Sequence, residues 1–282
     1  MSLINRVNDC SVFHPERYVD FFVAGLHVGH TEKAFAAQLV DTSSIFHLIE
    51  EKLYLTDSLK TPEERTKAVH PILRKLKDEG FIPGWRDELY PVRETFYGRP
   101  LMSVERATIS LFGVRGQGVH LNGYVKTKEG ISMWIGKRSA NKPTGPGKLD
   151  QLVAGGLPIG ITVQKNLEKE CWEEASIPAS LAKNSRPAGA VSYLTERPDG
   201  LRHDLEYVFD LELPRDFTPL NTDGEVSNFF LWPLNQVKKT LETSDAFKFN
   251  SGLVVIDFLV RHGFLTPEDP DYTKIILGLN LS

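Results

Sequence analysis

Hydrophobic positions in the first hundred residues recur mainly at helical spacing. Residues 32–40 (EKAFAAQLV) and residues 61–79 carry apolar side chains three and four positions apart, which predicts two amphipathic helices. The second stretch begins at Thr61 and has Glu64 three residues later, the arrangement of a capping box. With some strand between the helices, this part predicts a small α+β domain over residues 1–115.

From about residue 104 the pattern changes to that of β-strands. Residues 104–114 (VERATISLFGV) and 119–127 (VHLNGYVKT) alternate or run apolar, and the glycines at Gly116 and Gly118 predict a turn between them. Further strands are predicted at residues 132–139, 188–196, 204–213 and 227–234, and a helix at 252–262. We therefore expect a mixed β-sheet flanked by helices over residues 116–282, and an α+β fold for the whole chain.

Composition and charge narrow the class of protein. The 282 residues are 41% hydrophobic and 25% charged with a net charge of −4, as in soluble globular proteins without a basic surface for nucleic acid. No apolar run approaches the ~20 residues that span a bilayer, so no membrane partner is expected. The first residues lack the apolar segment of a secretory signal, and Cys10 and Cys171 are too few for a disulfide framework. A reducing, cytoplasmic location is the resulting expectation.

An acidic helical segment follows two adjacent glycines, Gly155 and Gly156. Glu170, Glu173 and Glu174 stand at i, i+3 and i+4, so they share one face of a helix. Like charges at this spacing destabilise a helix by a few tenths of a kcal/mol per pair. A hard divalent cation such as Mg²⁺ or Mn²⁺ would offset the repulsion because it prefers oxygen ligands. A solvated helix face is the more frequent origin of such a run, so spacing alone leaves both interpretations open.

The order of these parts resembles the Nudix hydrolase signature. That signature runs Gly, five residues, Glu, seven residues, then Arg-Glu-apolar-x-Glu-Glu-x-Gly-apolar. Gly155 takes the place of the first glycine, Lys169 that of the arginine, and Ile177 that of the closing apolar residue. Ile161 stands where the first glutamate is expected and Ser176 where the second glycine is expected, which affects the support of the site. The resemblance implies that three residues are metal ligands: Glu170, Glu173 and Glu174.

Further site residues follow from the resemblance and from the chemistry that binding of an organic diphosphate requires. Glu225 matches a place where many Nudix enzymes supply one more acidic residue from a loop, although a plain turn residue fits its surroundings equally well. Glu174 or Glu225 is the candidate base, and Lys169 supports the metal-binding glutamates. The candidate substrate-binding residues are Gly155, Gly156, Arg138, Lys148 and Trp85. For the last three, a surface charge or a packing role is the alternative.

Longer phrases extend the resemblance to one branch of the family. GWRDELYPV, GVHLNGYV, KLDQLVAGGLPIG, KECWEEASIP and DGEVSNFFLWPL resemble Nudix proteins related to the domain fused to thiamine pyrophosphokinase in some fungi. That branch carries an N-terminal domain like residues 1–115. It implies hydrolysis of thiamine diphosphate, preferentially of its damaged oxo- and oxythiamine forms, to the monophosphate. A Nudix hydrolase of a nucleotide diphosphate derivative such as ADP-ribose, and a non-catalytic Nudix-like binding module, are the alternatives.

Overall fold

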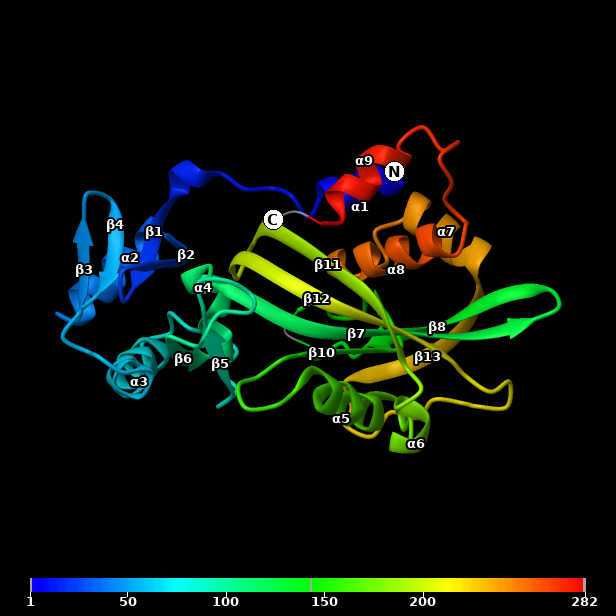
Figure 1. Ribbon diagram of the computed structural model, residues 1–282, viewed down its shortest axis with the longest axis horizontal. Helices are drawn as coiled ribbons and strands as arrows, with labels where there is room; N and C mark the ends of the chain where they lie inside the picture. Colours follow the sequence, from blue (N-terminus) through cyan, green and yellow to red (C-terminus); the bar gives the residue numbers. More distant parts are fainter. Residues whose placement is uncertain (1, 143, 281–282) are drawn as a thin grey trace.

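Two β-sheets, one in each half of the chain, organise the computed structural model, which describes residues 2–142 and 144–280 (Figure 1). The N-terminal sheet has the order β2-β1-β4-β3. Its strands are β1 (Tyr18–Val23), β2 (Leu26–Glu32), β3 (Phe46–Ile49) and β4 (Lys52–Leu55). Helices α2 (Lys33–Thr42) and α3 (Pro62–Asp78) and the strand pair β5 (Leu89–Val92) and β6 (Met102–Glu105) share its core.

The two helices predicted in this half are confirmed. The capping box is also present at the start of α3. The Thr61 hydroxyl accepts a hydrogen bond from the Glu64 backbone N–H, and the Glu64 carboxylate accepts one from the Thr61 N–H, each at 3.1 Å. Two of the backbone donors left over at the helix start are thereby satisfied.

The C-terminal sheet has the order β11-β12-β7-β8-β13, with β10 paired to β7 and β9 to β8. Its strands are β7 (Arg115–Thr127), β8 (Gly130–Arg138), β9 (Leu149–Asp150), β10 (Val153–Gly156), β11 (Arg186–Arg197), β12 (Gly200–Glu212) and β13 (Val226–Pro233). The pairing of β12 with β7 is parallel and the other pairings are antiparallel, so the sheet is mixed as predicted.

Helices cover both faces of this sheet (Figure 1). One face carries α5 (Val163–Ala175) and α6 (Ala179–Ala182), and the other carries α7 (Leu234–Thr243), α8 (Phe249–Arg261), α9 (Tyr272–Gly278) and α1 (Leu3–Asn8). The N-terminal helix α1 therefore packs in the C-terminal half, where Leu3 and Val7 are buried beside α7 to α9. The predicted α+β fold is confirmed.

The predicted strand at residues 104–114 and the turn after it are wrong. Strand β6 ends at Glu105, and a 3₁₀ turn, η2 (Arg106–Thr108), and the short helix α4 (Ile109–Phe112) follow. Gly116 and Gly118 lie inside β7 instead of in a turn. A Cβ atom on Gly116 would lie 2.2 Å from Asp204 Oδ1, and one on Gly118 would lie 2.2 Å from Glu206 Oε2. These glycines thus make room for acidic side chains of the neighbouring strand β12.

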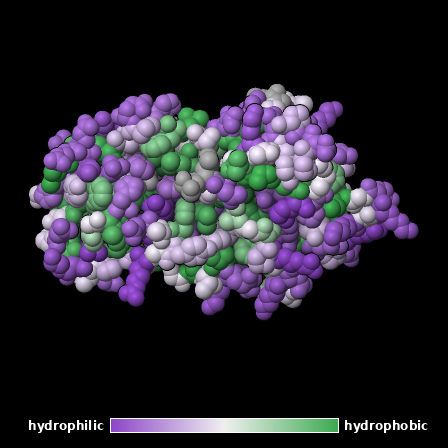
Figure 2. Space-filling view, turned by 45° about the horizontal axis from the view of Figure 1, so that its top comes forward, coloured by the Kyte–Doolittle hydropathy of each residue, from purple (hydrophilic) through white to green (hydrophobic). Residues whose placement is uncertain are grey.

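The surface is mostly polar. Hydrophilic residues cover most of the face shown in Figure 2, with hydrophobic residues in small groups between them. The most exposed large apolar side chains, Tyr97, Leu220 and Leu277, lie on three separate segments, which is ordinary for a folded chain. Within residues 2–142 and 144–280, no helix is both long and apolar enough to cross a membrane.

Candidate functional site

Helix α5 presents its glutamates beside strand β10 because its apolar face is buried. The helix begins after Thr162, whose hydroxyl accepts the Lys165 backbone N–H at 3.3 Å. Leu167 and Cys171 are fully buried against the sheet, in one cluster with residues of β7 and β10. The acidic positions that alternate with them are left at the edge of this contact, over the glycines of β10.

The glycines of β10 allow the close approach of the acidic helix. A Cβ atom on Gly155 would lie 2.3 Å from Cδ of Glu170, and one on Gly156 would lie 2.1 Å from the Tyr90 hydroxyl of β5. Glu174 Oε2 accepts the Ala154 backbone N–H at 2.8 Å. Both glycines belong to an extended strand and form no turn, and their small size is what the site requires.

Two of the three candidate metal-binding carboxylates of α5 contact the ammonium group of Lys169, while the third, that of Glu174, lies buried nearby. Lys169 Nζ lies 3.1 Å from Glu170 Oε1 and 3.1 Å from Glu173 Oε2. Burial raises the pKa of Glu174 well above its usual value, and the charge of Glu170 raises it further. Burial also raises the pKa of Glu170, which Lys169 partly opposes. Burial is the main cause of both shifts, so the surroundings of Glu170 and Glu174 disfavour the charged form of their carboxyl groups.

The fourth acidic residue, Glu225, lies before β13 among basic side chains. Its carboxylate is hydrogen-bonded to Lys142 Nζ and lies 3.9 Å from Arg86 Nη1. Burial favours a raised pKa for Glu225, but the bond to Lys142 and the positive charges around it outweigh burial and lower the pKa. The charge of Glu225 in turn raises the pKa of Glu174, which brings Glu225 into the electrostatic neighbourhood of the acidic helix.

Basic side chains from segments that are distant in sequence complete the surroundings of the acidic site. Arg106, from the turn after β6, lowers the pKa of both Glu170 and Glu225. Arg106 and Lys142 were not anticipated from the sequence, because no spacing links a turn of the N-terminal half or a Pro- and Gly-rich loop to α5. Arg86 lies in the phrase GWRDELYPV, next to Trp85. Arg106 thus places positive charge near Glu170, and Arg86 and Lys142 place it around Glu225.

Two predicted substrate-binding residues have other partners in the structure. Arg138 is buried, with Nη1 2.8 Å from Asp150 Oδ2, and it also donates to the Thr144 carbonyl. The Trp85 ring lies under the Arg74 guanidinium, 5.0 Å away, and its Nε1 donates to Asp87 at 2.8 Å. Both side chains are therefore held by local contacts, and no contact joins either one to the glutamates of α5.

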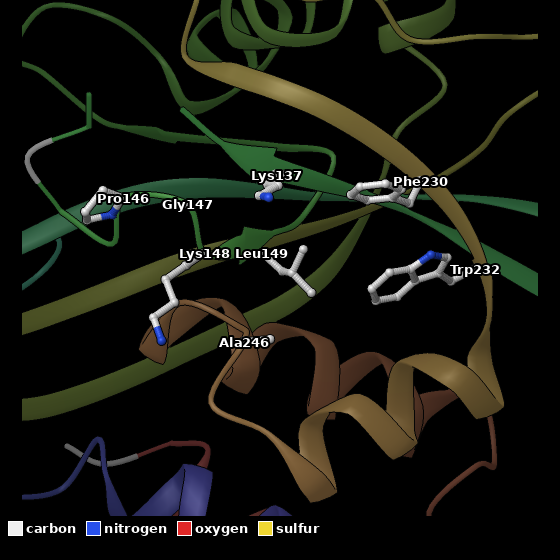
Figure 3. Close-up of a pocket in the computed structure, with 8 residues that line it drawn as sticks. All are labelled: Lys137, Pro146, Gly147, Lys148, Leu149, Phe230, Trp232 and Ala246. Atoms are coloured by element: carbon white, nitrogen blue, oxygen red, sulfur yellow. The ribbon is translucent and has the colours of Figure 1, made fainter. Parts of the chain in front are cut away.

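Lys148 lies at a cleft on the sheet face that carries α7 and α8 (Figure 3). Its Nζ donates to Asp245, at 2.9 Å from Oδ2 and 2.6 Å from the carbonyl. The cleft has a volume of about 460 Å³ and also contains the stacked rings of Phe230 and Trp232. Figure 3 shows Lys148 at one end of the cleft and the two rings at the other. The acidic helix packs on the opposite face of the sheet.

Comparison with known proteins places this arrangement in a family. A sequence profile described as a domain of unknown function (DUF4743) matches residues 1–116. Nudix hydrolase 20, chloroplastic, of Arabidopsis thaliana is 44% identical over 281 residues, 96% of this chain and 75% of the relative. Nudix hydrolase 24, chloroplastic, of the same plant is 44% identical over 260 residues, 92% of this chain and 71% of the relative. The chain is a hydrolase, and it belongs to the Nudix hydrolase family.

A solved structure with similarity to the chain is that of DR0079 from Deinococcus radiodurans, at a TM-score of 0.45 and 18% sequence identity. The alignment covers 63% of this chain and 98% of that one. The predicted family and enzyme class are confirmed by the Arabidopsis relatives. The predicted cytoplasmic location is wrong, because both of these relatives are named as chloroplastic proteins.

Proposed function

We propose that this chain is a divalent-metal-dependent hydrolase of small organic diphosphates, with thiamine diphosphate as the substrate class. Its oxo- and oxythiamine forms are the preferred substrates, and the products are the monophosphate and inorganic phosphate. The observation that supports the reaction type is the grouping of the α5 carboxylates with basic side chains. Lys169 of the same helix contacts Glu170 and Glu173, and Arg106 of another segment lowers the pKa of Glu170. The substrate class rests on the resemblance of the five longer phrases to one Nudix branch.

The acidic side of the site fits a hard divalent cation. Glu170, Glu173 and Glu174 offer only oxygen donors, the ligands that Mg²⁺ and Mn²⁺ prefer. Two of these carboxylates have raised pKa values because they are buried, so a bound cation would relieve an unfavourable charge. When bound, the ion would neutralise the diphosphate and polarise the phosphorus that water attacks.

The chain's own residues supply the remaining functions. Arg86, Arg106 and Lys142 provide fixed positive charge for the phosphates, which stabilises the charge that develops during anhydride cleavage. Glu174 or Glu225 accepts the proton of the attacking water. The water oxygen then joins the terminal phosphorus, the bridging P–O bond breaks, and the monophosphate leaves. Arg86 and Arg106 come from residues 1–115, so we infer that this accessory domain contributes to the substrate site of residues 116–282.

The decisive experiment separates metal-dependent products by chromatography. Oxothiamine diphosphate, thiamine diphosphate and ADP-ribose are each incubated with the enzyme in Mg²⁺ or in EDTA. Three proteins are compared: the wild type, Glu174→Gln, and the control Glu168→Gln. Glu168 lies on the same helix but accepts a hydrogen bond from Gln164 at 3.1 Å, away from the site.

The proposal expects metal-dependent turnover that is fastest on the oxidised thiamine compound, lost in Glu174→Gln and kept in Glu168→Gln. Turnover of ADP-ribose alone would retain the metal site and overturn the thiamine assignment. No turnover of any compound, with unchanged Mg²⁺ affinity in Glu174→Gln, would favour the binding module, which the departures at Ile161 and Ser176 allow.

A further inference from the structure

Three side chains of types that ligate metal ions lie close together in the N-terminal sheet. Asp20 of β1 and His27 and His30 of β2 each offer one ligand atom, and these atoms lie within 4.8 Å of one another. None of the three is part of the glutamate site on α5. The proposed hydrolase reaction therefore does not account for the grouping of these three side chains.

A β-bulge in β2 brings the two histidines to the same face. Residues three apart in a regular strand point to opposite faces of the sheet. The pairing of β1 with β2 shifts from Phe21 opposite Gly29 to Phe22 opposite His27, which leaves Val28 as an extra residue. Val28 is fully buried in the core, while both histidines are only partly buried on the outer face, beside Asp20.

The spacing of the ligand atoms suits a transition-metal ion. Asp20 Oδ1 lies 3.0 Å from His30 Nδ1 and 3.6 Å from His27 Nε2. Ligand atoms around tetrahedral zinc, with bonds of about 2.0–2.2 Å, lie roughly 3.4 Å apart. His27 Nε2 is shielded from water and has no hydrogen-bond partner in the described part of the chain. A bound cation would satisfy this nitrogen, whose burial is otherwise unfavourable.

The three side chains complement one another as ligands of a cation. A neutral imidazole has a free lone pair for a cation. Asp20 supplies the negative charge among the three ligands, and Arg115 Nη1 is engaged with the Val28 carbonyl at 3.5 Å.

We propose that Asp20, His27 and His30 form a binding site for a divalent transition-metal ion such as Zn²⁺, with further coordination positions open to water. Two nitrogen donors and one carboxylate suit Zn²⁺, whereas the all-oxygen glutamates of α5 suit Mg²⁺. The His30 backbone N–H donates to the Gly113 carbonyl at 3.3 Å, next to the start of β7. A bound ion would therefore brace the N-terminal sheet where it meets the long strands (Figure 1).

Zinc titration by calorimetry tests the proposal, with excess Mg²⁺ present to occupy the glutamate site. The proteins are the wild type, Asp20→Asn, His27→Gln, His30→Gln, and His47→Gln as a control on β3, where the histidine is exposed. We expect one Zn²⁺ per wild-type chain, affinity weakened about tenfold or more in each ligand variant, and no change in His47→Gln. Cobalt added in place of zinc should give visible absorption that the ligand variants lose.

The variants are checked by thermal melting without zinc, so that loss of binding is not confused with loss of fold. His27→Gln is the most informative variant, because Nε2 makes no hydrogen bond whose removal would destabilise the sheet. Absence of saturable Zn²⁺ binding in the wild type would overturn the proposal. Equal Zn²⁺ affinity in the wild type and in folded His27→Gln and His30→Gln would also overturn it, whatever substrate the hydrolase site takes.

Discussion

Replacing Gly155 by alanine tests whether the first glycine of the signature makes room for Glu170, a proposed metal ligand. The added Cβ atom would lie 2.3 Å from Cδ and 2.5 Å from Cγ of Glu170, whereas ordinary contacts begin at 3.4 Å. The Glu170 side chain must therefore withdraw by about 1 Å, since β10 is held to β7 by its strand pairing. The backbone of Gly155 is not in the left-handed region, so alanine introduces no strain of that kind.

Gly155→Ala should lower the activity of the enzyme more than it lowers its stability. Overpacking a well-packed site costs typically about 1–3 kcal/mol, and the flexible glutamate side chain places this case near the lower end. Misplacing a catalytic group by about 1 Å costs on the order of 100-fold in rate. We therefore expect kcat/KM for the diphosphate to fall about 100-fold, while the free energy of unfolding falls by about 1 kcal/mol.

The assay measures metal-dependent hydrolysis and, independently, Mg²⁺ affinity by calorimetry. Gly252→Ala in α8 is the matched control, because the nearest atom to its added Cβ, Leu241 Cδ2, lies at an ordinary 3.5 Å. Wild-type turnover and Mg²⁺ affinity in Gly155→Ala would refute the steric argument. A loss of activity that is explained entirely by unfolded protein would refute it as well.

Three further predictions address pH dependence, the end of α5 and the basic residues. Burial lowers the pKa of His203 to about 4, so between pH 6.5 and 4 the unfolded chain binds a proton that the folded chain does not. The free energy of unfolding should therefore fall by about 2 kcal/mol on going from pH 7 to 5. Urea unfolding of His203→Gln should show a smaller fall, and an equal fall would contradict the assignment of this pH dependence to His203. Ser176→Ala should lower the free energy of unfolding by about 1 kcal/mol, because it removes the 2.7 Å hydrogen bond to the Leu220 carbonyl and keeps φ at 53°. Ser176→Gly should be more stable than Ser176→Ala in the same urea assay, since glycine adopts this φ without strain. Arg106→Gln should raise KM for the diphosphate about tenfold or more in steady-state kinetics, and exposed Arg99→Gln should not; equal KM values would remove Arg106 from the substrate site.

The local pattern of hydrophobic and polar residues was sufficient to predict a helix or strand whose formation depends on its own residues. The capping residues of α3 and the alternation of β8, β11 and β12 predicted those elements close to their observed bounds. The i, i+3, i+4 spacing likewise placed Glu170, Glu173 and Glu174 on one face of α5, and Lys169 beside them. Helical and strand periodicity are properties of the chain itself, so they can be read before the fold is known.

The local pattern did not predict the roles of several glycines. Gly116 and Gly118 look like a turn when only their neighbours in sequence are considered. In the fold they lie in a strand, where they accommodate Asp204 and Glu206 from β12. Gly155 likewise serves the approach of Glu170, which is fifteen positions later in the chain. A glycine required by a distant side chain has no local signature.

The sequence by itself determined the family, the acidic helix and the mixed sheet, because these depend on spacing along the chain. Only the tertiary structure decided which charges face one another. It brought Arg106 and Lys142 to the acidic site, held Arg138 in a buried ion pair, and used one extra residue in β2 to align His27 with His30. Electrostatic and metal-binding interactions act over a few ångströms in space, whatever the separation of the residues in sequence.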